Sequence, residues 1–111
     1  MKVSDVVLLE EAVEDLEIGR HFYEERETGI GRYFIDSSLG DIVSLHLYAG
    51  IHSVQFGFYR MLFKRFPFAA YYDVEDGVVR VVAVLDMRKD PESIRTVLSK
   101  RKSQQDEPGN A

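Results

Sequence analysis

The chain contains no cysteine among its 111 residues. This absence excludes a disulfide framework, a thiolate zinc site and a cysteine nucleophile. A run of apolar residues long enough to span a bilayer is also missing, and the N-terminal segment MKVSDVVLLEEAVED has acidic residues where a signal peptide needs its apolar stretch. We therefore expect a cytoplasmic protein that does not enter a membrane.

Side chains that hold metals or bind phosphates are few and poorly spaced. The three histidines, His21, His46 and His52, include no His-x-x-x-His pair, and no aspartate or serine is spaced to make one of them a general base. Gly29 and Gly31 follow no predicted strand and precede no Lys-Ser or Lys-Thr pair, which is typical of a turn. We expect no metal, no cofactor, and histidines that are structural or solvated.

Charge is unevenly distributed along a chain whose composition is that of a globular protein. Hydrophobic residues make up 45% and charged residues 30%, and a chain of this length forms one domain around one core. The net charge is -5, but residues 1–27 hold nine acidic and three basic side chains, whereas residues 60–102 hold ten basic ones. The second half therefore carries either an anion-facing surface or an ordinary solvated charged face.

The first half predicts a strand followed by two helices. Residues 3–9 are rich in valine and leucine, which indicates a short, well-buried strand. Helical spacing of apolar residues predicts one helix over residues 10–27 and another over residues 30–49, ended by Gly50. The short glycine-containing turn between them makes an antiparallel helical hairpin. Its expected buried stripes are Ala12, Val13, Leu16, Gly19 and Tyr23, and then Phe34, Ser38, Ile42 and Leu45.

The second half predicts three antiparallel strands and a C-terminal helix. The strands are expected over residues 54–63, 67–74 and 78–87, which are aromatic or β-branched. Glu75-Asp76-Gly77 is a tight-turn signal between the last two. Asp90-Pro91 ends the last strand and opens a helix that extends to Lys100 or Arg101. Residues 102–111 lack apolar periodicity, which is typical of a disordered tail.

The predicted fold class is therefore α+β. It consists of a strand, a helical hairpin, a three-stranded antiparallel β-meander and a C-terminal helix, with the domain over residues 1–101 and the tail over residues 102–111. Successive side chains of a strand point to opposite faces, so at least one of Tyr71 and Tyr72 is expected in the core.

This order of elements, together with the segment RFPFAAYYDVEDGVVRVVAVLDMRKDP over residues 65–91, resembles the RelE/ParE toxin superfamily, which includes plasmid stabilisation proteins. The family shows an aromatic-rich strand after an Arg-x-Pro-like element, a turn, a valine-rich strand and an Arg/Lys-Asp-Pro corner. The helical hairpin of the family is similar to the first half of this chain, which reads EEAVEDLEIGRHFYEE, a Gly-x-Gly turn and GRYFIDSSLGDIVSL. The resemblance covers about residues 3–101 and identifies the fold better than the target.

The resemblance implies the toxin of a type II toxin-antitoxin system, which inhibits growth unless an antitoxin binds it. RelE-like members cleave messenger RNA on the ribosome, and ParE-like members inhibit DNA gyrase. Arg60 and Arg88 stand where the ribonucleases carry a lysine and an arginine, which makes them the candidate catalytic residues. Ala69 and Ile94 stand where the ribonucleases carry an arginine and a tyrosine-like residue, so groups for proton transfer and phosphate stabilisation are missing. This favours a non-enzymatic ParE-like inhibitor over a ribonuclease. An inactive relic that only binds an antitoxin is a third alternative, which these positions do not test.

Antitoxin and target are expected to bind basic and apolar surface that the fold leaves uncovered, which would make the protein a hetero-oligomer with its antitoxin. Strand pairing around the Glu75-Asp76-Gly77 turn concentrates positive charge at one edge, unless Asp86 and Asp90 neutralise it in a salt-bridged rim. Apolar residues of the helical hairpin outside its main stripe offer a groove, and an open sheet edge offers backbone groups for an added strand. The expected binding residues are Arg60, Lys64, Arg65, Arg88, Lys89, Ile18 and Phe22.

Overall fold

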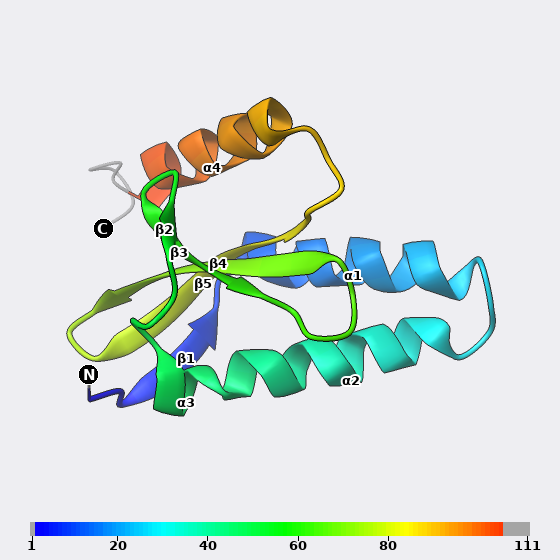
Figure 1. Ribbon diagram of the computed structural model, residues 1–111, viewed down its shortest axis with the longest axis horizontal. Coiled ribbons are helices and arrows are strands. Elements are labelled where there is room, and N and C mark those ends of the chain that lie inside the picture. Colours follow the sequence, from blue (N-terminus) through cyan, green and yellow to red (C-terminus); the bar gives the residue numbers. More distant parts are fainter. Residues whose placement is uncertain (1, 106–111) are drawn as a thin grey trace.

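A computed structural model describes residues 2–105, and these residues form the α+β fold that the sequence predicts (Figure 1). The elements are, in order, β1 (Asp5–Leu8), α1 (Glu10–Glu24), α2 (Ile30–Val43), α3 (Leu45–Tyr48), β2 (Val54–Gln55), β3 (Phe58–Leu62), β4 (Phe68–Glu75), β5 (Val78–Asp86) and α4 (Pro91–Gln105). A five-stranded sheet in the order β1-β5-β4-β3-β2 forms the centre, and α2 and α4 lie on opposite sides of it.

The hairpin of β4 and β5 sets the register of the sheet. Glu75 pairs with Val78 across the predicted turn, in which Asp76 and Gly77 have φ values of 52° and 79°. Two positive φ angles are typical of a type I′ turn, whose twist matches that of antiparallel strands. β1 then pairs with β5 in parallel, from Asp5 beside Val78 to Leu8 beside Val81. The sheet is therefore mixed, with one parallel pair at its edge.

The single strand predicted over residues 54–63 is wrong, because this segment forms a second hairpin. β2 and β3 are antiparallel, with Gln55 opposite Phe58. The turn consists of Phe56 and Gly57, which have φ values of 54° and 86°. An aromatic side chain is unfavourable at positive φ, so the sequence conceals this turn inside an aromatic run. The predicted three-stranded meander thus gains a fourth strand at its outer edge.

Four further details of the helices and β1 differ from prediction. β1 is partly exposed rather than well buried, because it is the outer strand of the sheet. Val13, expected in the buried stripe of α1, is exposed, and the second predicted helix is interrupted at Ser44 between α2 and α3. α4 continues to Gln105 where a tail was predicted from residue 102, and the remaining residues 106–111 lie outside the described part of the chain.

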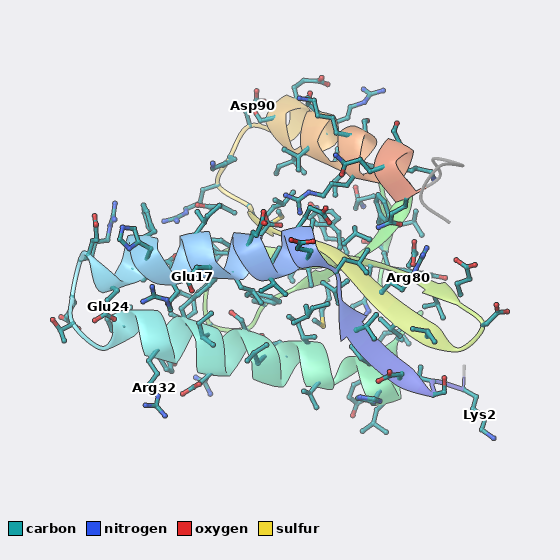
Figure 2. All side chains as sticks on the ribbon, turned by 180° about the vertical axis from the view of Figure 1, so that it is seen from behind. Lys2, Glu17, Glu24, Arg32, Arg80 and Asp90 are labelled. Carbon is teal, nitrogen blue, oxygen red and sulfur yellow. The ribbon has the colours of Figure 1, made fainter. Side chains whose placement is uncertain are left out.

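The turn of the helical hairpin is closed by one carboxylate. Glu24, at the end of α1, accepts hydrogen bonds from the backbone N–H groups of Gly29 at 3.0 Å and of Gly31 at 3.0 Å (Figure 2). A Cβ atom on Gly31 would lie 2.7 Å from the carbonyl oxygen of Arg20, so glycine allows α1 and α2 to approach closely. The predicted antiparallel hairpin is therefore confirmed, with a turn that its own glutamate stabilises.

Each face of the sheet has its own apolar core. The helical hairpin buries residues of its predicted stripes on one face, and α4 buries Ile94 and Leu98 on the other. Tyr71 and Tyr72 are both fully buried and belong to opposite cores, which confirms that this aromatic pair is structural. The first core contains Ala12, Leu16, Phe34, Ile42, Leu45, Tyr72, Val81 and Val84, and the second contains Phe58, Ala69, Tyr71, Val82, Ala83, Ile94 and Leu98.

A β-bulge lets β5 contribute to both cores. Tyr71 pairs with Ala83 and Tyr72 pairs with Val81, so Val82 is an extra residue on β5. At the bulge, a backbone N–H and a backbone carbonyl of β5 form hydrogen bonds with side chains. The Val84 N–H donates to Asp15 Oδ2 at 2.9 Å, and the Val82 carbonyl accepts from Arg101 Nη1 at 3.0 Å.

Asp15 and Arg101 form an ion pair that joins α1 to α4 beside this bulge. Arg101 Nη2 donates to Asp15 Oδ1 at 2.8 Å, and Nη1 contacts Oδ2. Only 9% of the Asp15 side chain and 17% of the Arg101 side chain are exposed. The hydrogen bond to the carboxylate of Asp15 raises the pKa of Arg101, which favours the charged guanidinium. Both charges are held out of water by their partner and by the backbone of β5.

We expect Asp15→Ala to lower the free energy of unfolding by about 3–5 kcal/mol, because Arg101 loses its counter-ion and the Val84 N–H loses its acceptor. Asp15→Leu combined with Arg101→Met should recover part of this loss, since apolar residues replace a buried ion pair with little penalty. Urea unfolding followed by circular dichroism measures both variants. Glu14→Ala, at the exposed neighbouring position, is the control. A loss below about 1 kcal/mol for Asp15→Ala would show that the pair does not hold α4 in place.

Candidate functional site

A groove of about 390 Å³ runs between α1 and α4, which lie antiparallel to one another (Figure 1). β5 forms its floor through Val84, Leu85 and Asp86. Its walls and ends are Ile18, Gly19 and Phe22 from α1, Ser93, Ile94 and Val97 from α4, the Asp15–Arg101 pair, Phe68 and Lys89. The lining is mainly apolar, with charged side chains toward the ends, which is the composition of a binding site for an amphipathic partner.

Ile18 and Phe22 lie where the sequence predicts, in exposed positions on α1 outside its buried stripe. Both side chains line the groove. The other wall, however, is α4, whereas the sequence suggested a groove belonging to the helical hairpin. The reason is that α4 covers the other face of the sheet and is tied to α1 past β5 by the pair of Arg101 and Asp15. The binding role of the two apolar residues stays a prediction.

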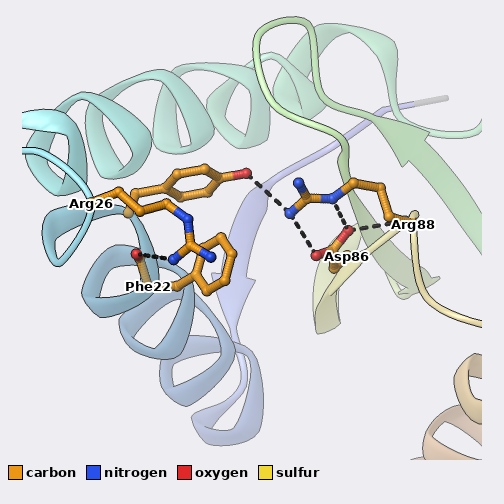
Figure 3. Close-up of polar contacts among 5 residues, drawn as sticks. Phe22, Arg26, Asp86 and Arg88 are labelled. Atoms are coloured by element: carbon orange, nitrogen blue, oxygen red, sulfur yellow. Dashed lines mark hydrogen bonds and ion pairs between the residues drawn. The ribbon is translucent and has the colours of Figure 1, made fainter.

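Arg88 is paired with Asp86 beside this groove (Figure 3). Its Nε and Nη2 atoms donate to the two carboxylate oxygens at 2.9 Å and 2.8 Å, and Nη2 lies 3.4 Å from the Tyr23 hydroxyl. The hydrogen bonds from Arg88 lower the pKa of Asp86, and the carboxylate raises the pKa of Arg88. Arg88 therefore belongs to a salt-bridged rim, and Asp86 compensates its charge.

The ring of Phe22 lies between two arginines. The guanidinium carbon of Arg26 is 3.5 Å from the ring centroid and that of Arg88 is 5.8 Å from it (Figure 3). Arg26 also donates from Nη1 to the Phe22 carbonyl at 3.0 Å, which fixes its position over the ring. Cation–π contacts of this kind hold an aromatic side chain in place while one part of it stays accessible. Phe22 is therefore an oriented apolar group at the wall of the groove.

The basic loop before β4 and the basic corner after β5 lie side by side, as the hairpin predicts. The Met87 N–H donates to the Pro67 carbonyl at 2.7 Å, which brings residues 64–67 next to residues 87–89. The side chains of Lys64, Arg65 and Lys89 are exposed there. Asp90 accepts from the Glu92 N–H at 3.2 Å, so this carboxylate caps α4. The edge thus carries exposed positive charge beside the neutralised Arg88.

Arg60 lies apart from this edge. On β4 it pairs with Tyr71, which pairs with Ala83 on β5. Arg88 comes five residues after Ala83, just beyond the end of β5, which is roughly 15 Å farther along the chain. The Nε atom of Arg60 is buried and has no hydrogen-bond partner among residues 2–105. Burial raises the pKa of Tyr71, and the charge of Arg60 partly offsets that shift. The two candidate catalytic arginines are therefore not brought into one site.

The positions that lack ribonuclease side chains are inside a core. Ala69 is 0% and Ile94 is 6% exposed, and both pack between the sheet and α4. The three histidines are also accounted for: His52 Nδ1 lies 2.6 Å from the buried Tyr72 hydroxyl, His21 pairs with Glu25, and His46 is exposed. Burial lowers the pKa of His52. Within residues 2–105 no three aspartate, glutamate or histidine side chains are arranged to hold a metal ion.

Sequence reasoning missed Asp15 and Arg101, although both gave a signal. Asp15 is three residues from Ala12 and four from Gly19, which places a carboxylate on the buried stripe of α1. Arg101 is three residues from Leu98 and falls on the same side of α4. A charged residue on a buried stripe requires a buried partner of opposite charge. Among the helices described over residues 2–105, none is long and apolar enough to cross a membrane.

We expect the carboxyl group of Asp86 to titrate below the ordinary aspartate pKa, and Arg88→Gln to raise that pKa toward the ordinary value. Because the folded-state pKa is the lower one, this pair stabilises the fold above the ordinary pKa, and its contribution is lost as the pH falls through the folded-state value. Carboxyl-carbon chemical shifts followed from neutral to acidic pH measure the change. Arg32→Gln, on the outer side of α2, is the control and should leave Asp86 unaffected.

Similarity to known proteins is confined to structure. No protein-family model and no curated protein matches the chain. A chain of the solved structure "Chromosomal ParDE TA system from P. aeruginosa" superposes with a TM-score of 0.66, covering 75% of this chain and 94% of that one, at 17% sequence identity. At this level of identity the similarity shows the fold alone. The chain therefore has the ParE/RelE-like fold that its sequence resemblance predicts.

Proposed function

We propose that this chain is the toxin of a type II toxin-antitoxin pair and that it inhibits DNA gyrase by contact, as ParE-like members of the superfamily do. The observation that carries this proposal is the apolar filling of the sheet face under α4. Ala69 and Ile94 occupy the positions of two ribonuclease groups, are buried, and have no atom that could transfer a proton or stabilise a phosphate. Binding is thus better supported than catalysis.

The placement of the arginines supports the same proposal. General acid–base cleavage of a phosphodiester needs its charged groups within hydrogen-bond reach of one substrate. Arg60 and Arg88 are on opposite sides of β4 and are separated along the sheet, and Arg88 is already paired with Asp86. A protein that acts by contact needs only exposed apolar and charged side chains, and the groove and basic edge supply both.

A ribosome-dependent ribonuclease is the second candidate function, and one observation favours it. Arg60 lies beside Tyr71, and its buried Nε atom has no hydrogen-bond partner among the described residues. This N–H group could therefore donate a hydrogen bond to a substrate. Arg60 is half-buried, so the rest of its side chain is accessible although Nε is not. An inactive relic that binds an antitoxin and nothing else would give no growth phenotype.

We expect induction of this chain without its partner to arrest growth with filamentation and DNA-damage signalling, while bulk translation at first continues. Gyrase inhibition leaves messenger RNA intact, whereas a ribonuclease would stop protein synthesis within minutes of induction. Pulse labelling of protein, RNA blots and microscopy distinguish the two. Early cleavage of messenger RNA would refute the proposal in favour of the ribonuclease, and normal growth would identify a relic.

The antitoxin is proposed to bind in the groove between α1 and α4. An amphipathic segment would place apolar side chains against Ile18 and Phe22 and acidic ones toward Lys89 and Arg65 at the basic edge. Addition of a strand to β1 is less well supported, because the Val6 N–H already binds the Asp5 side chain at 2.9 Å. A segment that is disordered when free and folds on binding would suit so elongated a site.

We expect Ile18→Asp to weaken antitoxin binding by about tenfold or more, because it places a charge in the apolar wall of the groove. Val13→Asp is the matched control: Val13 is also exposed on α1 but does not line the groove. Calorimetric titration with the protein encoded by the adjacent short reading frame measures both. Equal effects from the two variants would place the antitoxin elsewhere on α1.

The basic edge is tested by salt dependence in the same titration. Arg65→Ala combined with Lys89→Ala removes two exposed cations and should reduce both the affinity and its dependence on ionic strength. Arg32→Ala combined with Arg95→Ala removes two exposed cations elsewhere and serves as the control. If the two pairs behave alike, only the apolar half of the docking proposal stands.

A further inference from the structure

The outer side of α2 and α3 carries an apolar ridge that no element of the described chain covers. Leu39, Val43 and Leu47 follow one another at intervals of four residues, and Val43 and Leu47 are 61% and 80% exposed. These three residues are here termed the α2 ridge. Further exposed apolar side chains of the same helices and of the turn after them are Tyr33, Tyr48 and Ile51. Apolar patches of this extent mark interaction sites on soluble proteins.

The ridge is continuous although α2 ends before it does. Ser44, between α2 and α3, has right-handed helical angles of φ -60° and ψ -17°. Its N–H donates to the Gly40 carbonyl at 3.3 Å, and the Tyr48 N–H donates to its carbonyl at 3.0 Å. The chain therefore keeps its helical course from Leu39 to Leu47. Rows of side chains four residues apart are the ridges by which helices pack against one another.

We propose that the α2 ridge is the contact through which two copies of this chain form a two-fold symmetric dimer. A two-fold axis at Val43 sets this residue against itself in the other copy and sets Leu39 against Leu47, so the ridge is complementary to itself. Beside the ridge, a Cβ atom on Gly40 would have nothing within 4 Å, which leaves room for the side chains of a second helix.

Charge favours a second copy over the acidic partner proposed for the groove. The ridge residues are uncharged, and the neighbouring Arg32 and Asp36 pair with each other at 3.6 Å. Figure 2 shows Arg32 on the outer side of α2, pointing away from the sheet. An acidic segment would gain little from a ridge whose own side chains are uncharged, whereas a copy of the same surface meets no charge of like sign at Leu39, Val43 and Leu47.

The exposed apolar surface is consistent with a dimer contact. Leu39, Val43 and Leu47 are 37%, 61% and 80% exposed, and these side chains can form the apolar centre of an interface whose standard size is ~800 Å² per partner. α2 and α4 lie on opposite sides of the sheet, so dimerisation would leave the groove between α1 and α4 open in both copies (Figure 1). The dimer goes beyond the proposed function and does not depend on it.

Sedimentation equilibrium of the purified full chain tests the dimer. The wild type should have twice the 12.8 kDa mass of one chain at micromolar concentration. Leu47→Glu should raise the dimer dissociation constant by at least about tenfold with an unchanged circular dichroism spectrum, because Leu47 is largely exposed within one copy. Ile18→Glu, an apolar-to-acidic change in the groove, is the matched control and should remain dimeric. A monomeric wild type up to about 100 μM would overturn the proposal.

A cross-linking experiment places the axis. Because the chain has no cysteine, Val43→Cys introduces a single thiol, and mild oxidation should link two copies rapidly through it. Ile18→Cys, equally accessible but away from the ridge, should link at the slower rate of random collision. Equal rates for the two variants, or a dimer that persists in Leu47→Glu, would show that the copies do not meet at the α2 ridge. If the wild type is monomeric and Leu47→Glu no longer binds the antitoxin, the ridge is the binding surface for that partner instead.

Discussion

The position of α4 depends on the ion pair between Asp15 and Arg101. The carboxylate accepts hydrogen bonds from Arg101 and from the Val84 N–H, and the guanidinium also donates to the Val82 carbonyl. The two side chains thus provide partners for a backbone N–H and a backbone carbonyl of β5 at the bulge. This arrangement ties α1, β5 and α4 together at one point. Two features follow from it: α4 covers the second face of the sheet, and a groove is left between α4 and α1. The pair thus adds a polar connection between α1, β5 and α4 to the apolar packing of Ile94 and Leu98.

Much of the fold could be predicted because its signals are local. The glycine turns, the two amphipathic helices, the valine-rich strand and the Asp76-Gly77 turn are each encoded in a few consecutive residues, and the structure confirms them. Phe56 shows where this approach fails: an aromatic residue at positive φ hides a turn inside a segment with strand composition. The prediction that Val13 is buried was wrong for a different reason. Helical periodicity shows which side of α1 is buried, but it does not show how wide the buried stripe is.

The candidate site was harder to predict because its parts come from distant segments. Ile18 and Phe22 could be identified as apolar residues off the main stripe, but their opposite wall comes from α4, more than seventy residues later in the sequence. Arg88 illustrates the same difficulty. Its charge is countered by Asp86 two residues before it, while the direction of its side chain depends on Tyr23 and Phe22 in α1. Residue type and order therefore indicate which groups are available, and only the packing decides which remain free.

The parallel pairing of β1 with β5 determines when this protein can finish folding. β1 has its strand partner 73 residues later in the chain, and Asp15 has its counter-ion 86 residues later, close to the end of α4. A ribosome therefore releases the helical hairpin long before the segments that cover it, and contacts this distant form slowly. During that interval the apolar stripes of the hairpin are open to other molecules. The fold can therefore be completed only after α4 has been synthesised, and until then the apolar side of the hairpin lacks its intramolecular cover.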